Sequence, residues 1–399
     1  MLPGPLSPTL QEGLVRLGTW LPFAPAAAML AHFAHVEVGE ATARRRTEAL
    51  GAAYVQLQLA EVARLEHEAP PSPAGPALQQ VSVDGVMVPL QHGEWGEVKV
   101  VAIGTVEPPA APTTEPAHAT QLSYFARRAE ADQFRWAALG ELHRRGTFTA
   151  ERVVGIADGA EWCQGFYGLH RPDAVRILDF THAFEYLVAA AQTCFGPEPP
   201  AATDWLTTQR HELLTGDPAQ VLAALAALPT AAAPDPTRAR DAQATALGYL
   251  EARRDQIRYA TFRAAGYPIG SGMVESANKL VVEARLKGPG MHWAPPSINP
   301  MVALRTLAGN DRWDEAWPAL TGYVRQRARQ TADQRRQRRR AAPAPPTAAP
   351  PAPTRPPAPA PSAAPRPKLV VNGRPTAQHP WRRRLLPPRT PAPAPPPKS

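Results

Sequence analysis

The sequence predicts an α/β fold: a mixed sheet flanked by helices, with a helical insertion, a small helical region before it and a Pro/Arg-rich tail after it. Residues 81–90 and 97–107 alternate between apolar and polar side chains, which is typical of half-buried strands. The runs VVGIA and VRIL, residues 153–157 and 175–178, are continuously apolar, as in central strands buried on both faces. A third strand near 121–128 and helices near 131–145, 160–170 and 182–196 complete the pattern of a sheet with helices on its faces.

Residues 1–69 form the predicted helical region, because apolar residues recur there at spacings of three and four. A helix ending near His35, the short break VEVG and a second helix have the proportions of a helix-turn-helix. In that interpretation Arg44, Arg45 and Arg46 on the second helix contact DNA. Two packed helices joined by a short loop are also common in plain cores, so the pattern leaves both alternatives open.

Changes in composition predict the remaining boundaries. Residues 70–80 are a Pro-rich linker, residues 81–199 and 263–324 form the α/β domain, and the helical residues 200–262 are inserted between them. Residues 325–399 hold 17 Arg and Lys against one acidic residue, and 21 of the 49 prolines. A segment of this composition buries too little apolar surface to fold, so we expect a disordered tail whose arginines hold phosphates without sequence discrimination.

The net charge of +8 belongs to this tail, which carries +16 and leaves −8 for residues 1–324. The total charge is therefore no indication that the folded part binds a polyanion.

Two cysteines cannot form a disulfide framework or a four-ligand zinc site. The apolar stretch 17–34 contains two prolines and lacks a basic flank, unlike a signal peptide or a membrane span. We expect a cytoplasmic protein that has no membrane partner.

Three acidic residues occupy special places in the predicted sheet. Asp84 lies on the first strand, Asp158 ends the fourth, and Glu275 opens the helix that follows the insertion. Neighbouring strand ends and a helix packed across them would bring the three carboxylates together, where their repulsion would require divalent cations. Oxygen ligands suit two Mg²⁺ ions, or Mn²⁺, and a pair of such ions supports displacement at phosphorus. This interpretation predicts cleavage or transfer of phosphodiesters.

Each of these residues also has a purely structural interpretation. Asp84 before Gly85 is compatible with a bulge or turn, and Asp158 with a cap on the next helix. Glu275 is compatible with an exposed position favoured by the helix dipole. Asp179 and His182, three residues apart at a strand-to-helix junction, would either contact the substrate phosphate or serve as a helix cap and its neighbour.

The residues after Glu275 predict a phosphate-binding surface. Asn278 and Lys279 share a helical face with Glu275, and Arg285 and Lys287 extend a positive rim. The loop that follows contains Trp293, which would either stack on an unpaired base or lie in the core.

Long ordered motifs resemble bacterial insertion-sequence transposases of the DDE type, the ISKra group, which is related to the Mutator-like transposases. The resemblance covers about residues 6–317 and rests on VDGVMVPL, GEWGEVKVVAIG, DGAEWCQGFYGLHRPDAVRILDFTHAFEYL, YLEARRDQIRYATFRAAGYPIGSGMVESANKLVVEARLKGPGMHW and NPMVALRTLAGNDRWDEAW. A shorter echo lies near Trp381.

The resemblance implies an RNase H-like domain whose metal ligands are Asp84, Asp158 and Glu275, and a Mutator-like Asp-and-His signature at Asp179 and His182. It also implies binding of the element's terminal inverted repeats, cleavage of its ends, and joining to target DNA by a homo-oligomer. Family members often begin with a cysteine-bearing, zinc-ribbon-like segment, whereas no cysteine precedes Cys163 here. We therefore expect an N-terminally shortened chain, and a DNA-binding remnant or a stand-alone RNase H-like nuclease is the alternative.

Overall fold

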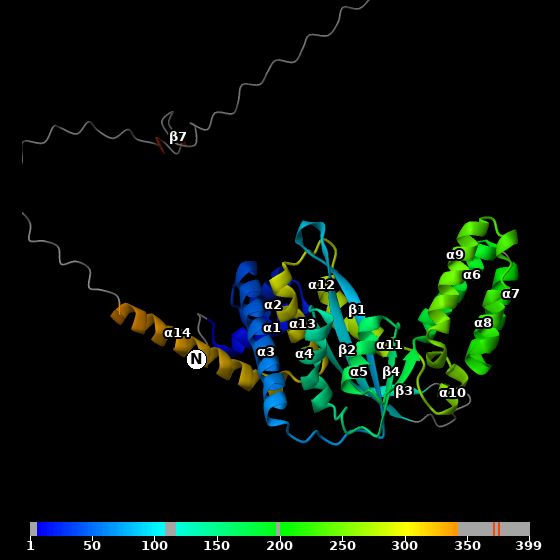
Figure 1. Ribbon diagram of the computed structural model, residues 1–399. Helices are drawn as coiled ribbons and strands as arrows, with labels where there is room; N and C mark the ends of the chain where they lie inside the picture. Colours follow the sequence, from blue (N-terminus) through cyan, green and yellow to red (C-terminus); the bar gives the residue numbers. More distant parts are fainter. Residues whose placement is uncertain (1–5, 108–116, 197–199, 342–369, 372–373, 376–399) are drawn as a thin grey trace, which may run out of the picture. The chain divides into compact units, whose positions relative to one another are not determined.

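A five-stranded mixed sheet forms the framework of the protein (Figure 1). Its strands lie in the order β3-β2-β1-β4-β5. Strands β1, β2 and β3 are antiparallel neighbours, whereas β4 runs parallel to β1 and β5 runs parallel to β4. The strands are β1 (Leu78–Pro89), β2 (Trp95–Glu107), β3 (His118–Arg127), β4 (Arg152–Ala157) and β5 (Val175–Leu178). The predicted α/β class, with a mixed sheet flanked by helices, is confirmed.

The computed structural model describes residues 6–107, 117–196, 200–341, 370–371 and 374–375. The α-helices within Met1–Arg335 surround the sheet, and α14 continues past that unit. They are α1 (Pro8–Trp20), α2 (Phe23–Ala34), α3 (Glu40–Glu68), α4 (Ala131–Arg144), α5 (Glu161–His170), α6 (Phe180–Phe195), α7 (Pro200–Thr215), α8 (Pro218–Ala226), α9 (Pro236–Glu251), α10 (Tyr259–Ala264), α11 (Gly272–Ala277), α12 (Ala284–Leu286), α13 (Pro295–Gly309) and α14 (Trp313–Ala341). Short 3₁₀ turns are η1 (Gln91–Gly93), η2 (Thr230–Ala232) and η3 (Arg254–Gln256), and η4 (Asn278–Glu283) is a π-helical turn.

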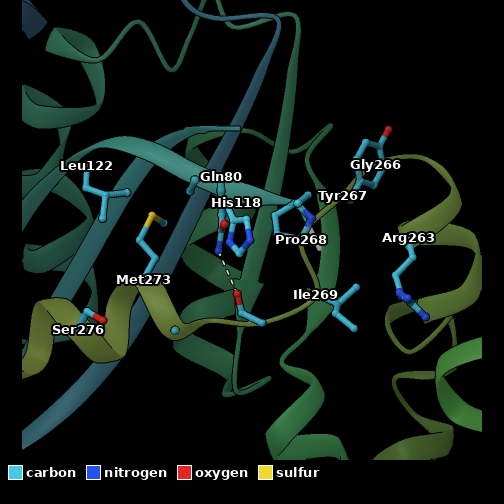
Figure 2. Close-up of a pocket in the computed structure, with 14 residues that line it drawn as sticks. Gln80, His118, Leu122, Arg263, Gly266, Tyr267, Pro268, Ile269, Met273 and Ser276 are labelled. Carbon is cyan, nitrogen blue, oxygen red and sulfur yellow. Dashed lines mark hydrogen bonds between the residues drawn. The ribbon is translucent and has the colours of Figure 1, made fainter. Parts of the chain in front are cut away.

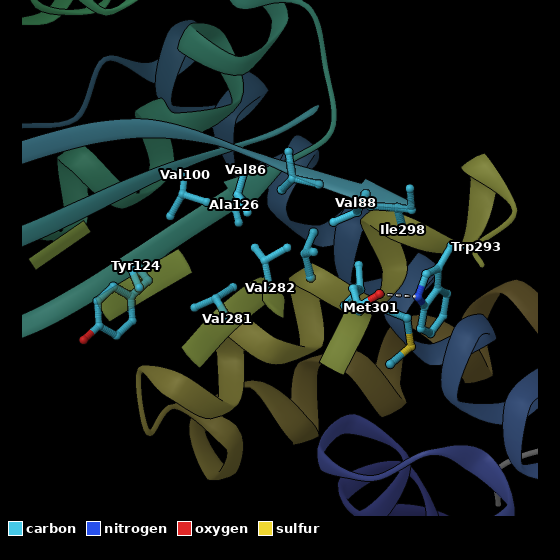
Figure 3. Close-up of a cluster of buried hydrophobic side chains, with 14 of the residues drawn as sticks. Val86, Val88, Val100, Tyr124, Ala126, Val281, Val282, Trp293, Ile298 and Met301 are labelled. Carbon is cyan, nitrogen blue, oxygen red and sulfur yellow. Dashed lines mark hydrogen bonds between the residues drawn. The ribbon is translucent and has the colours of Figure 1, made fainter. Parts of the chain in front are cut away.

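Alternation along β1 divides the core into two layers, because successive side chains point to opposite faces of a sheet. Val81 and Val83 pack with α4 and α5 on one face. Val86 and Val88 pack on the other face with α11, η4 and α13, as Figure 3 shows. Even-numbered positions of β1, including Asp84, therefore belong to the face that carries α11 and η4.

The N-terminal helices share the core of the sheet. Leu14, Phe23 and Leu30, from α1 and α2, belong to the same apolar cluster as Val88 and Val281. Helix α3 packs along α13. The break between two helices was predicted correctly, since α2 ends at Ala34 and α3 begins at Glu40, but these helices are built into the α/β unit. Strand β1 also begins at Leu78, inside the predicted linker.

The insertion is helical, as predicted. Helices α6 to α9 lie side by side (Figure 1), with contacts between α6 and α7, α7 and α8, α8 and α9, and α6 and α9. Their apolar cluster includes Val154 and Ile156 of β4 and Leu178 of β5. The insertion, which holds α7 to α10, therefore packs together with α6 against the face of β4 and β5 that carries Val154 and Ile156.

The predicted start of the disordered tail, residue 325, lies too early in the chain. Residues 325–341 form the second half of α14, which starts within the core at Trp313. Val370–Val371 and Arg374–Pro375 pair as two short antiparallel strands, β6 and β7. The rest of the expected tail, and the echo near Trp381, lie outside the described residues.

Among the helices described, none combines the length and the apolar character needed to cross a membrane.

Candidate functional site

Three aspartates are level across three neighbouring parallel strands: Asp84 lies within β1, Asp158 follows the end of β4, and Asp179 follows the end of β5. The pairing of β1 with β4, extended two residues beyond its last pair, sets Asp84 opposite Asp158. The pairing of β4 with β5, extended one residue, sets Asp158 opposite Asp179. Ligands of open α/β sheets bind outside the carboxyl ends of the strands, so this edge is where a site is expected.

Asp84 is a partly buried carboxylate with two hydrogen-bond donors. Its Oδ1 accepts from the backbone N–H of Gly85 at 2.7 Å, and its Oδ2 accepts from Nδ2 of Asn278 at 2.6 Å. Burial raises the pKa of Asp84, and the negative charge of Asp158 acts in the same direction. The two hydrogen bonds and the nearby His182 act against this increase. A desolvated carboxylate beside a second carboxylate is an environment that a cation would stabilise.

Asp158 lies in a turn that the insertion holds in place. Its Oδ1 accepts from the backbone N–H of Ala160 at 2.9 Å, and the Cys163 thiol lies 3.5 Å from the same oxygen. The backbone carbonyl of Asp158 accepts from the Tyr249 hydroxyl, and that of Gly159 accepts from Arg253 at 2.8 Å. Asp158 thus accepts one amide just before α5 and does not cap that helix, whose N-cap is Ala160 without a side-chain hydrogen bond.

Gly159 shows why the insertion can approach so closely. Its φ of +81° lies in the left-handed region, and a Cβ at this position would come within 3.0 Å of both the Tyr249 hydroxyl and the Arg253 side chain. Arg253 also lies over the Tyr249 ring, 3.9 Å from its centroid. The sequence analysis did not identify Tyr249 and Arg253, because Arg253 lies in the turn after α9 and its contact with Gly159 depends on the tertiary fold.

Asp179 is a buried cap. One carboxylate oxygen accepts from the backbone N–H of His182 at 2.9 Å and so caps α6, and the other accepts from the N–H of Ser271 at 2.6 Å. With 1 % of its surface exposed, Asp179 has no access to a phosphate in this structure. Of the two alternatives left open for Asp179, the structure therefore shows the cap. His182 is half-buried, and its Nδ1 lies 3.4 Å from the Glu185 carboxylate.

The glycine-rich turn before Glu275 is tied to the sheet at three points. Besides the bond from Ser271 to Asp179, the carbonyl of Ile269 accepts from the backbone N–H of Phe180 at 3.1 Å. The carbonyl of Gly270 accepts from Nε2 of Gln80 at 3.2 Å (Figure 2). Gln80 was not identified from the sequence, because a glutamine on a strand carries no local signal. These bonds determine where α11 begins.

Glu275 lies on α11 one turn before Asn278, on the same helical side, and its side chain is exposed. Asn278, in contrast, is 8 % exposed and reaches Asp84. Within the described ranges, no group of three or more His, Cys, Asp or Glu side chains is arranged to hold a metal ion. The structure thus brings Asp84 and Asp158 together and leaves Glu275 apart from them.

Asn278 takes a different role from the one expected. It contacts a carboxylate, and its Oδ1 is buried with no hydrogen-bond partner. It is also the first residue of the π-helical turn η4, a distortion that is frequent at functional sites. Two carboxylates and an unpartnered amide oxygen are hard oxygen donors of the type that Mg²⁺ and Mn²⁺ prefer. The donor chemistry fits such a cation, although a third carboxylate must come from elsewhere.

One residue of the expected positive rim, Arg285, is buried. Arg285 is 2 % exposed, with its guanidinium 4.6 Å from the Phe23 ring centroid and 5.1 Å from that of Trp293. Burial lowers the pKa of Arg285 to about 10. Assigning Arg285 to DNA contact was therefore wrong, because the side chain joins α2 to the core. Lys279 and Lys287 are exposed, and Lys287 lies 2.7 Å from the Glu283 carboxylate.

Trp293 is a core residue. Its ring is 7 % exposed, its Nε1–H donates to the carbonyl of Leu286 at 3.1 Å, and it contacts Phe23 edge-on (Figure 3). The base-stacking alternative left open by the sequence is therefore not available in this structure.

The arginines of the helix-turn-helix candidate lie near the start of α3. Arg44 and Arg45 are exposed and Arg46 is half-buried. Arg44 lies 3.8 Å from Glu48, which offsets part of its charge. The predicted DNA contact by these residues remains a prediction.

A separate cavity of ≈ 430 Å³ lies beside the anchored turn (Figure 2). It is lined by Gln80, His118, Arg263, Tyr267, Met273 and Ser276, among others. Asp84, Asp158 and Asp179 are not among the residues that line this cavity, so the cavity and the three aspartates are different places.

Two comparisons with known proteins give no match for this chain. The chain matches no family in a scan against protein-family models, and a search of curated proteins finds no relative.

Proposed function

We propose that the protein is an insertion-sequence DNA transposase with an RNase H-like catalytic domain that cleaves and joins phosphodiesters. The observation that carries the proposal is the pair Asp84 and Asp158, level on the first and fourth strands of a β3-β2-β1-β4-β5 sheet, with Asp84 desolvated. The resemblance to the ISKra group and its Mutator-like relatives supports the same assignment. The substrates would be the element's terminal inverted repeats and target DNA, bound by a homo-oligomer.

In this proposal Asp84, Asp158 and Glu275 would hold the divalent cations. Two Mg²⁺ ions, or Mn²⁺, would activate the attacking oxygen and stabilise the leaving oxygen. Glu275 is exposed on a helix whose start is anchored by Gly270 and Ser271, so it joins the pair by side-chain and helix adjustment when DNA binds. His182, beside the aspartates, assists at the scissile phosphate.

The first experiment measures cleavage and strand transfer on a labelled duplex that carries the end of the element, with Mg²⁺ or Mn²⁺. We expect wild type to nick at the repeat boundary, whereas Asp84→Asn and Glu275→Gln bind the duplex without cutting it. Glu283→Gln is the matched control: Glu283 lies further along the same helical segment than Glu275 and pairs with Lys287 at 2.7 Å, so its substitution should retain activity. Cutting by Glu275→Gln at the wild-type rate would remove Glu275 from the catalytic site.

One observation favours a second candidate, a DNA-binding remnant that does not catalyse. The described residues do not gather Glu275 with the two aspartates, as an assembled three-carboxylate site requires. Binding of the repeat by wild type with no cleavage in either metal would support the remnant. Cleavage without dependence on the repeat would instead support a stand-alone nuclease of this fold.

A further inference from the structure

The second half of α14 is a helix that leaves the core. Its first half is anchored by Trp313 and Leu320, which are 5 % and 0 % exposed and pack with Leu50 and Leu307. From residue 325 to residue 335 every side chain except Ala328 is exposed. A helix that is polar all round gains little from packing against a core, so the side chains of this segment are open to contact with a partner.

The exposed segment has two kinds of surface. A shallow groove of ≈ 270 Å³ shows that six polar side chains share one side, which we call the glutamine face: Tyr323, Gln326, Arg327, Gln330, Thr331 and Gln334. The three glutamines recur every four residues, so they occupy a sector of about 80° and lie about 6 Å apart along the axis. At 100° per residue, Arg325 and Arg329 border this face on one side and Arg335 on the other.

This arrangement matches the chemistry of duplex DNA. A helix about 10–12 Å across fits the major groove of B-form DNA. Glutamine can bond the N6 and N7 edge of adenine in a bidentate manner, and arginines outside the groove hold phosphates. A spacing of about 6 Å corresponds to roughly two base-pair steps, so neighbouring glutamines would meet different base pairs.

Other polyanions fit this surface less well. Residues 325–335 contain no large apolar side chain, whereas a helix that binds a membrane surface or an apolar protein groove needs an apolar face. The major groove of A-form RNA is too narrow for side chains to read. Asp333 is the single acidic residue of the segment, so its net charge is positive.

We propose that residues 323–335 of α14 enter the major groove of B-form DNA. The glutamine face contacts base edges and prefers A·T pairs, while Arg325, Arg329 and Arg335 hold the phosphates on both sides. This site is distinct from the arginines of α3 and from the aspartates of the sheet. The inference rests on the proposed function only in naming DNA as the polyanion.

The test uses the full-length protein and duplexes selected from a pool with a randomised central segment, measured by fluorescence anisotropy over a range of salt concentrations. We expect the triple variant Gln326→Ala, Gln330→Ala and Gln334→Ala to lose about tenfold or more of the preference for the selected duplex over random DNA. Its affinity for random DNA and its salt dependence should stay at the wild-type level, because the phosphate contacts remain.

The triple variant Arg325→Ala, Arg329→Ala and Arg335→Ala should bind all duplexes more weakly and reduce the slope of log affinity against log salt by about 3. The control is Arg238→Ala with Arg240→Ala, which removes two exposed arginines from α9 and should change neither quantity. Circular dichroism of each variant checks that its fold is retained.

Unchanged sequence preference in the glutamine variant, or tighter binding of duplex RNA than of duplex DNA, would overturn the proposal. Cleavage by the wild-type protein separates the two hypotheses. If wild type binds the selected duplex through α14 and does not cut it with Mg²⁺ or Mn²⁺, the groove-binding inference stands and the catalytic proposal fails.

Discussion

At the scale of single residues, Asp84 on β1 and Asp179 after β5 differ because their hydrogen-bond donors and their burial differ. Asp84 keeps a partly buried carboxylate whose pKa is raised by burial, and it shares its surroundings with Asp158. Asp179 gives both oxygens to backbone N–H groups and is fully enclosed. The first environment favours cation binding, whereas the second stabilises the junction between β5, α6 and the turn before α11.

We expect Asp179→Asn to destabilise the protein by about 2–4 kcal/mol, because the new amide turns an N–H donor toward the buried N–H of Ser271. Urea denaturation followed by circular dichroism measures this change. Asp217→Asn is the matched control: Asp217 is an exposed N-cap that accepts from Ala219 at 2.9 Å, and its loss should cost below about 1 kcal/mol. Equal effects of the two substitutions would contradict a special role for Asp179.

At the scale of elements, the protein depends on a close crossing between α3 and α13. A Cβ on Gly51 would collide with the backbone carbonyl of Pro300, which cannot move away as a flexible side chain could. Helix α1 is also close to α3, since a Cβ on Gly18 would meet the Thr47 side chain. Small residues at these positions therefore set the distance between the N-terminal helices and the core.

Gly51→Ala should lower the free energy of unfolding by about 1–3 kcal/mol, because backbone overpacking outweighs the gain in helix propensity. Gly248→Ala in α9 is the control, since a Cβ there meets nothing within 4 Å and should stabilise the helix by about 1 kcal/mol. Urea denaturation of both variants measures these changes in the free energy of unfolding. A stabilised Gly51→Ala protein would mean that α3 and α13 lie further apart than the structure shows.

At the scale of the whole molecule, the folded unit joins helices and sheet through buried cations as well as apolar contacts. Arg285 lies between Phe23 and Trp293, and Arg305 lies 4.0 Å from the centroid of the Trp20 ring. Both arginines are buried, and burial lowers the pKa of each to about 10. The N-terminal helices are therefore held to α12 and α13 by contacts that a detachable DNA-binding module would lack.

Acid should destabilise this unit through His170. Burial lowers the pKa of His170 to about 4, below its ordinary 6.5, and its Nε2 lies 3.0 Å from the carbonyl of Arg135. The full stabilisation is present above pH 6.5. As the pH falls from 6.5 to about 4, the unfolded chain takes up a proton that the folded protein does not, so up to about 3 kcal/mol is lost.

Urea denaturation between pH 7.5 and 4.5 tests this prediction with His170→Gln, which keeps a donor for the Arg135 carbonyl and does not titrate. We expect the variant to lose less stability than wild type over this interval. Parallel pH profiles of the two proteins would show that His170 is protonated in the folded state.

The sequence predicted the local elements well because their signals are local. Alternation over residues 81–90 identified β1, and the apolar run VRIL identified β5. Composition misled at residues 325–341, because an arginine-rich segment continues a helix that Trp313 and Leu320 anchor in the core. Arg285 was misplaced for a related reason, since its partners Phe23 and Trp293 lie on other elements.

The sequence by itself determined the α/β class, the succession of strands and helices along the chain and the presence of acidic residues at Asp84 and Asp158, because side-chain periodicity is a property of short segments. Tertiary structure alone decided that Asp179 is enclosed, that Arg285 is buried and that Glu275 stands apart from the two aspartates. Burial and hydrogen-bond partners decide these roles, and both come from residues that are distant in the chain.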